Sequence, residues 1–114
     1  MDNIVEEKSF RFAVRIVNLC RHLADTKKEY VLSKQVLRSG TSIGANIAES
    51  QNAQSRADFL SKLEIALKEV SETKYWLRLL KETDYLSAME FESIYPECVE
   101  LEKLLVSIVK STKK

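Results

Sequence analysis

A seam of mainly apolar residues between positions 59 and 80 constrains the fold of this chain more than any other feature. Its members alternate at steps of four and three: Phe59, Leu63, Ala66, Val70, Thr73, Leu77 and Leu80. This spacing places them all on one face of an α-helix, whereas a β-strand has a period of two. Ser55 and Asp58 form an N-terminal capping pattern just before the seam. We therefore predict an amphipathic helix over 55–82, roughly 40 Å long at 1.5 Å per residue.

Three further segments show the same periodicity and predict helices over about 8–24, 30–50 and 87–111. The last of them opens at Ser87 with Glu90 three residues later, which is the pattern of a capping box. Pro96 lies inside that helix and predicts a kink or a restart. The connections between the segments are short and polar, so consecutive helices should be antiparallel neighbours. The sequence thus predicts an all-α fold, an antiparallel up-down-up-down four-helix bundle that forms a single domain over 1–114.

The only two glycines, Gly40 and Gly44, lie four residues apart inside the second predicted helix. Glycine in a helix interior costs about 1 kcal/mol relative to alanine. Two of them within a run of small residues, including Ser39 and Ala45, therefore indicate that another backbone comes very close. We interpret these four residues as helix-packing positions.

The charges nearly cancel but are segregated along the chain. Lys and Arg number 18 and Asp and Glu 17, so the net charge of +1 favours neither nucleic acid nor a membrane surface as partner. Residues 8–45 nevertheless carry eight bases and two acids, whereas residues 82–102 carry seven acids and no base. The candidate phosphate contacts are Lys8, Arg11, Arg15 and Arg38, to which Arg21 and Lys34 could be added. The alternative interpretation of this stripe is an ordinary solvated helix face.

The segment from Gly40 to Gly44 fits the G-x-S-x-G pattern of serine hydrolases, with Ser42 at its centre. That pattern requires a sharp strand-to-helix turn and a histidine later in the chain. The sequence shows no strand, and the single histidine, His22, lies upstream. We therefore expect no catalytic residues and no enzymatic activity.

Metal, cofactor and membrane sites are not expected either. A di-iron bundle needs Glu-x-x-His pairs on two helices, but Leu19 stands three residues before His22. Cys20 and Cys98 have no C-x-x-C partner and fall at apolar helical positions, which predicts buried reduced thiols. The start of the chain lacks the features of a signal peptide, and no apolar run is long enough to span a membrane. A cytoplasmic location is the expectation.

The predicted helices carry more apolar surface than one bundle core uses. The surplus includes Phe12 and Ile16 on the first helix and Tyr75, Trp76 and Leu79 off the main seam of the third. Such residues are natural anchors of a subunit contact, and we predict that they form an oligomer interface.

The small-residue run belongs to a longer set of residues that resembles a known family. The set consists of Ser39-Gly-Thr-Ser-Ile-Gly-Ala-Asn-Ile-Ala-Glu49, Asp58-Phe59, Lys62-Leu63, Ile65-Ala-Leu-Lys-Glu69, Glu72-Thr73 and Tyr75-Trp-Leu77. It is similar to the four-helix-bundle proteins encoded by intervening sequences in bacterial 23S ribosomal RNA genes. The resemblance runs from about Ser9 to the end of the fourth predicted helix.

This resemblance implies an up-down bundle that assembles into a ring, usually a pentamer, with no known catalysis. Related accessory proteins of diversity-generating retroelements form similar basic barrels that bind nucleic acid and a reverse transcriptase. The present chain departs from such barrels because it is nearly neutral and its fourth helix is acidic. A modest basic stripe repeated around a ring could still bind structured RNA or DNA. The alternative is an assembly or adaptor protein whose partner is another protein, such as a reverse transcriptase.

Overall fold

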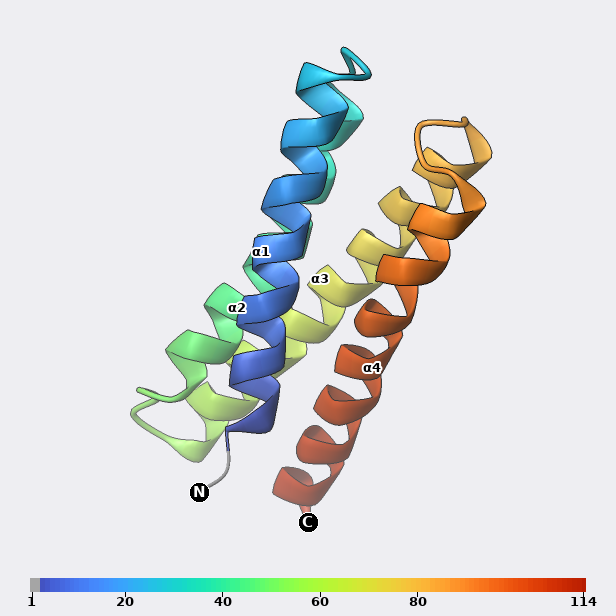
Figure 1. Ribbon diagram of the computed structural model, residues 1–114. Coiled ribbons are helices and arrows are strands. Elements are labelled where there is room, and N and C mark those ends of the chain that lie inside the picture. The colour runs from blue at the N-terminus through green and yellow to red at the C-terminus, as the bar shows by residue number, and fades with distance from the viewer. Residues whose placement is uncertain (1–2) are drawn as a thin grey trace.

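The computed structural model describes residues 3–114, which form four α-helices and no strand (Figure 1). The helices are α1 (Ile4–Asp25), α2 (Leu32–Ser50), α3 (Arg56–Glu82) and α4 (Ala88–Lys113). The all-α four-helix prediction is confirmed, and most helix ends lie within two residues of the predicted ones. The largest difference is at α1, which begins four residues earlier because Val5 packs against the core and Glu7 N donates to Asn3 O.

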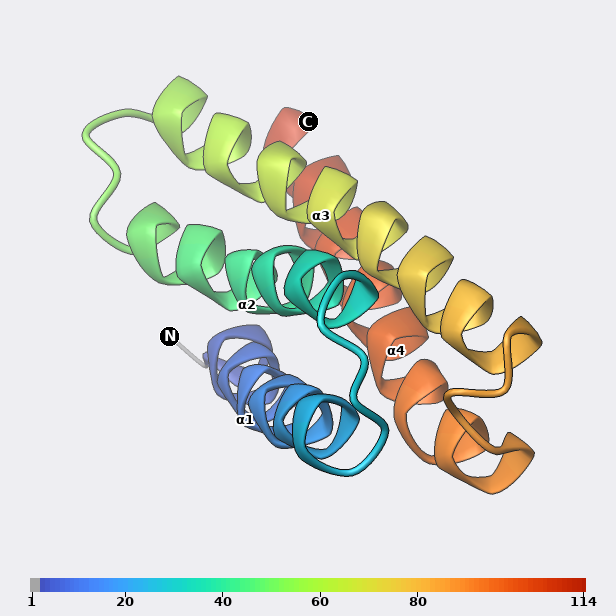
Figure 2. The same ribbon diagram turned by 90° about the horizontal axis from the view of Figure 1, so that it is seen from above.

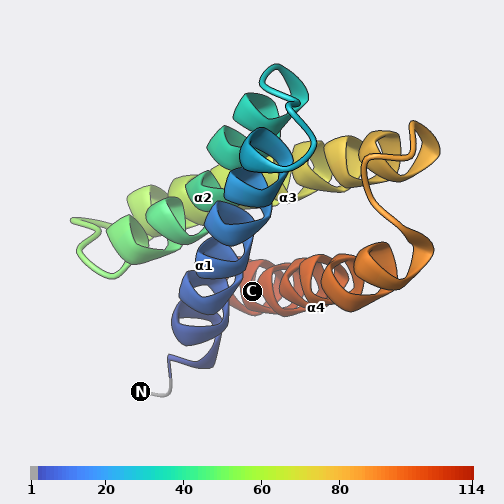
Figure 3. The same cartoon turned by 45° about the horizontal axis from the view of Figure 1, so that its top comes forward.

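Sequential helices pack against each other, and α1 closes the bundle against α4 through the least extensive of the four contacts. The molecule is elongated, with extents of 45 × 21 × 20 Å. Figure 2 shows α1 beside α2, followed by α3 and α4, when the bundle is seen from above. Figures 1 and 3 show that α1 and α4 diverge toward the end that carries the α1–α2 and α3–α4 loops. Long polar side chains therefore span much of the distance between these two helices.

The core is formed by the inward faces of all four helices. The seam predicted for α3 is buried from Leu63 to Leu80, and Phe59 at its start is half-buried. Facing residues from the other helices contribute to the core: Phe12, Ile16, Cys20, Leu23, Val36, Ile43, Ile47, Phe91, Ile94, Cys98, Leu101, Leu105 and Val109. The apolar period of the sequence is therefore the period of burial.

Local hydrogen bonds begin α3 and α4 where the sequence predicts them. Ser55 Oγ accepts from Asp58 N at 3.0 Å, and Ser87 Oγ accepts from Glu90 N at 3.0 Å. The capping box is complete, since Ser87 N donates to Glu90 Oε1 at 2.8 Å. This backbone hydrogen bond is the main reason that the pKa of Glu90 lies below its usual value. The helix α4 continues through Pro96 without a restart.

The N-terminus of α2 is held by Glu29, which precedes the helix predicted over 30–50. Its carboxylate is buried and accepts from the backbone N–H groups of Val31, Leu32 and Ser33 at 3.1, 2.9 and 2.7 Å. The Ser33 hydroxyl donates back to Glu29 O at 3.0 Å. Burial alone would raise the pKa of Glu29, but the donated hydrogen bonds outweigh it and lower the pKa. This carboxylate anchors the α1–α2 turn.

Candidate interaction surfaces

The two glycines lie where α2 packs closest to α1. A Cβ atom on Gly40 would stand 2.8 Å from Cγ1 of the fully buried Ile16, and one on Gly44 would stand 3.2 Å from the backbone oxygen of Ser9. The close approach that the sequence predicts therefore occurs between α1 and α2. Ala45, the fourth predicted packing residue, is exposed, because its position on α2 points away from both neighbouring helices. Its assignment to helix packing is corrected.

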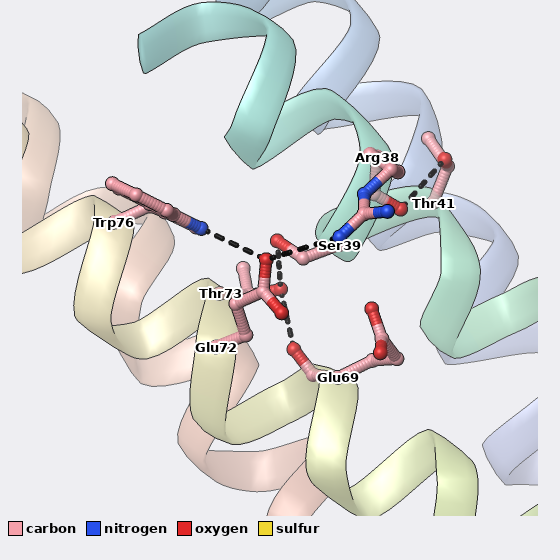
Figure 4. A network of polar contacts seen from close by, with 7 residues as sticks. All are labelled: Arg38, Ser39, Thr41, Glu69, Glu72, Thr73 and Trp76. Atoms are coloured by element: carbon pink, nitrogen blue, oxygen red, sulfur yellow. Dashed lines mark hydrogen bonds and ion pairs between the residues drawn. The ribbon is translucent and has the colours of Figure 1, made fainter.

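Ser39 packs on the other side of α2, against α3 (Figure 4). Its Oγ is hydrogen-bonded to Thr73 Oγ1 at 2.9 Å, and both residues are fully buried. Thr73 Oγ1 also lies 2.7 Å from Glu69 O. This polar contact inside an apolar interface is fully satisfied, and it ties one turn of α2 to one turn of α3.

Two residues of the predicted basic stripe on α1, Lys8 and Arg15, face the acidic helix α4. Lys8 Nζ lies 3.2 Å from Glu100 Oε2, and His22 Nε2 lies 3.9 Å from Glu90 Oε2. Between them, the Arg15 guanidinium is paired with Glu97 and donates to Ser93 O and Ser93 Oγ, both at 2.8 Å. We call these three contacts the α1–α4 seam. The segregation of charge along the chain thus corresponds to a polar contact between its first and last helices.

Arg11 and Arg38, the remaining predicted phosphate contacts, are not part of this seam. Arg11 pairs with Glu7 on its own helix at 2.8 Å, and Arg38 on α2 lies 3.9 Å from Glu72 on α3 (Figure 4). Both arginine side chains are 75% exposed. Of the four predicted residues, Lys8 and Arg15 are therefore engaged by α4, Arg11 is engaged by its own helix, and Arg38 lies on another helix, α2.

The predicted oligomer interface divides into buried and exposed members. Phe12 and Ile16 are fully buried in the core of the chain and have no surface to offer a second subunit, so their assignment is corrected. On a helix that is apolar over most of its circumference, the sequence does not reveal which face is covered. Trp76 is half-buried, and its indole N–H donates to Glu72 Oε2 at 3.1 Å (Figure 4).

Tyr75 and Leu79 line a groove between α3 and the start of α4 that has a volume of about 540 Å³. Tyr75 is 56% exposed. Phe91 and Tyr95 form the α4 side of the groove, with their rings stacked at 4.5 Å. Lys81 Nζ lies 5.0 Å from the centre of the Phe91 ring. We call this surface the aromatic groove.

A second exposed apolar surface was missed because it belongs to the same all-round apolar helix as Phe12. Phe10 is 69% exposed, and Val14, one turn further along α1, is also exposed. Phe10, Gly44 and Ala48 line one part of a hollow of about 450 Å³ between α1 and α2, and the polar residues Asn3, Glu6 and Glu7 line the rest of it. We call Phe10, Val14 and Ala48 the N-terminal patch. Its only signal in the sequence is the surplus of apolar residues on α1.

The features that could suggest chemistry have structural explanations. Ser42 lies inside α2, so the G-x-S-x-G segment is helical and not a turn between a strand and a helix. Burial raises the pKa of the Cys20 thiol to about 11 and that of Cys98 to about 12, which disfavours reactive thiolates. Within residues 3–114, no three His, Cys, Asp or Glu side chains are grouped closely enough to hold a metal ion.

None of the helices described here combines the length and the apolar character needed to cross a membrane.

Comparisons with known proteins place the chain among relatives whose function is open. The model of the 23S rRNA-intervening sequence protein family matches residues 1–107. A solved structure from Bacteroides thetaiotaomicron, described as a protein of unknown function from the S23 ribosomal protein family, is 59% identical with a TM-score of 0.93. That match covers 94% of this chain and 99% of the other. No functionally curated protein matches the chain.

Proposed function

Because the chain belongs to the 23S rRNA-intervening sequence protein family, we propose that it is a non-catalytic cytoplasmic protein that assembles with copies of itself into a closed ring, a pentamer. The observation that carries this proposal is the exposure of apolar side chains on two different faces. The N-terminal patch lies on α1 and α2, and the aromatic groove lies between α3 and α4. Exposed aromatic side chains such as Phe10 and Tyr75 are typical anchors of subunit contacts.

Two different patches favour a head-to-tail contact over a two-fold one. In a two-fold dimer the same patch meets itself, whereas a head-to-tail contact joins two unlike patches and repeats until the ring closes. In our proposal the N-terminal patch of one copy contacts the aromatic groove of the next. Every copy then covers both the N-terminal patch and the aromatic groove.

Light scattering or native mass measurement tests the ring. We expect the unmodified protein to be a pentamer at micromolar concentration, and Phe10→Ser or Tyr75→Ser to lower the mass. Met89→Ser is the matched control, because Met89 is 83% exposed and lies in neither patch. Mixing the Phe10→Ser and Tyr75→Ser proteins should produce a 1:1 dimer, since one keeps an intact groove and the other an intact patch.

A monomeric unmodified protein would contradict the proposed ring. The head-to-tail arrangement fails if the two variant proteins do not combine, or if each of them forms a stable dimer alone.

The second candidate function is binding of structured RNA or DNA to the ring. The exposure of the Arg11 and Arg38 side chains supports it, because each makes only one ion pair within residues 3–114 and remains largely in solvent. Repetition around a ring would sum the field of such a modest surface. The affinity should fall steeply between about 50 and 200 mM salt, with a shallower dependence in Arg11→Ala. Affinity that does not change with salt would exclude phosphate contacts.

The alternative, an adaptor that binds another protein such as a reverse transcriptase, is supported by the aromatic groove. In that case a partner captured from the cell is retained by Arg11→Ala and lost by Tyr75→Ser. Loss in both variants, or in neither, would speak against a specific role of the groove.

A further inference from the structure

A second groove on the α1–α2 side differs from the others in its charge. It lies between the C-terminal half of α1 and the N-terminal half of α2 and has a volume of about 360 Å³. Val17 and Leu37 give it apolar walls, Arg21 and Lys34 lie at its rim, and the 53% exposed ring of Tyr30 stands beside them. We call this surface the basic groove.

The cations of the basic groove are not neutralised in the way that those of the α1–α4 seam are. Arg21 and Lys34, together with Lys27 and Lys28 in the adjoining turn, are exposed and make no ion pair within residues 3–114. By contrast, Lys8 and Arg15 are paired with α4.

Two carboxylates are close in sequence to these cations, and only one of them opposes the cations. Asp25 lines the groove and is exposed. Glu29 is buried, and its charge is directed to the three backbone N–H groups at the start of α2. Lys27 lies close enough to Glu90 on α4 to help lower the pKa of that carboxyl group. The other three exposed cations, Arg21, Lys28 and Lys34, stand against the one exposed carboxylate of Asp25, so the surface attracts anions.

We propose that the basic groove binds a single-stranded segment of RNA or DNA. Arg21 and Lys34 contact its phosphates, and the Tyr30 ring stacks on one of its bases. This inference rests on the second candidate function, the binding of RNA or DNA. It places that binding in the basic groove and not at the α1–α4 seam. It does not depend on the ring.

The combination of groups in the groove favours a single strand over other anions. Proteins bind single strands through a positive groove that follows the backbone and aromatic side chains on which unpaired bases stack. The bases of a duplex are already stacked on each other and are not available to Tyr30. An acidic peptide would use the cations but would gain little from an exposed aromatic ring.

Fluorescence anisotropy with labelled oligo(dT) and oligo(rU) of about 20 nucleotides tests the groove over about 50–200 mM salt. Arg21→Ala and Lys34→Ala should each reduce the slope of log affinity against log salt by about 0.7. Tyr30→Ala should weaken binding roughly five- to a hundredfold without changing the slope, and Tyr30→Phe should retain binding. Lys103→Ala is the matched control and should behave as the unmodified protein, because Lys103 is an exposed cation on α4 that makes no ion pair within residues 3–114.

The outcomes separate this inference from the function on which it rests. If the unmodified protein binds but the Arg21→Ala and Lys34→Ala slopes are unchanged, the groove is wrong and nucleic-acid binding stands. If the unmodified protein binds neither oligonucleotide at the lowest salt, the groove is wrong, whereas binding of structured RNA or DNA is decided by its own salt titration. Displacement by polyglutamate together with no effect of Tyr30→Ala would identify a site for acidic polymers and overturn the proposal. Circular dichroism of each variant establishes that it is folded.

Discussion

Removing the Glu29 carboxylate should destabilise the protein more than removing any exposed acid. This side chain is the only group that caps the first turn of α2 from outside the helix, and no other side-chain cap satisfies that turn within residues 3–114. Glu29→Ala leaves the N–H groups of Val31, Leu32 and Ser33 without their acceptor. Glu29→Gln keeps one acceptor oxygen and should be the milder change.

The magnitude follows from the hydrogen bonds that are lost. Replacing a helix N-cap by alanine costs about 0.5–2 kcal/mol, and leaving a buried donor unsatisfied costs about 1–3 kcal/mol. Ser33 is buried, while water can reach the N–H groups nearer the loop. We therefore expect Glu29→Ala to lower the free energy of unfolding by about 2–4 kcal/mol and Glu29→Gln by about 1–2 kcal/mol.

Thermal and urea unfolding followed by circular dichroism measure this loss. An unfolding entropy of about 2.1 cal/mol/K per residue implies a Tm decrease of roughly 4 °C for each kcal/mol in a chain of this length. All proteins must be compared at one concentration, because self-association would make the Tm depend on it. Glu92→Gln is the control, since Glu92 is exposed on α4 and makes no ion pair within residues 3–114.

The effect should depend on pH in a defined direction. The pKa of Glu29 is lowered in the folded protein, so its carboxylate contributes its full stability above the unfolded-state value near 4.5. That contribution is lost as the pH falls through the lower folded pKa. The difference in stability between the unmodified protein and Glu29→Gln should therefore shrink below about pH 4.5. A difference that is absent at pH 7, or that stays constant down to acid pH, would refute the reasoning.

Two further predictions concern the faces of α2. Gly40→Ala should destabilise by about 1–3 kcal/mol despite its better helix propensity, because the new Cβ would stand 2.8 Å from the buried Ile16. Gly44→Ala, at 3.2 Å from Ser9 O, should be nearly neutral, and urea unfolding that shows equal losses would contradict this order. Thr73→Val should cost about 1–3 kcal/mol because it leaves the buried Ser39 hydroxyl without its partner. The double variant Ser39→Ala/Thr73→Val should recover part of that loss, and additive losses in the double-mutant cycle would show that the two hydroxyls are not coupled.

The four helices could be predicted from local sequence alone, because a helix is specified by a local period and by caps that act within four residues. The seam from Leu63 to Leu80 and the caps at Ser55 and Ser87 all lie where the sequence predicts them. The capping role of Glu29 was not predicted, because nothing in the local sequence shows that the carboxylate of a loop residue accepts hydrogen bonds from the start of the next helix.

The partners of the α1 side chains, by contrast, depend on how distant helices pack. Arg15 contacts Ser93 and Glu97, which are 78 and 82 residues away along the chain. No local sequence pattern could therefore show that its partners are on α4 and not the phosphates of a nucleic acid. Phe12 is buried and Phe10 is exposed, although both belong to one apolar helix surface. The period of a helix determines which residues share a face, and the packing of distant helices determines which of those faces is covered.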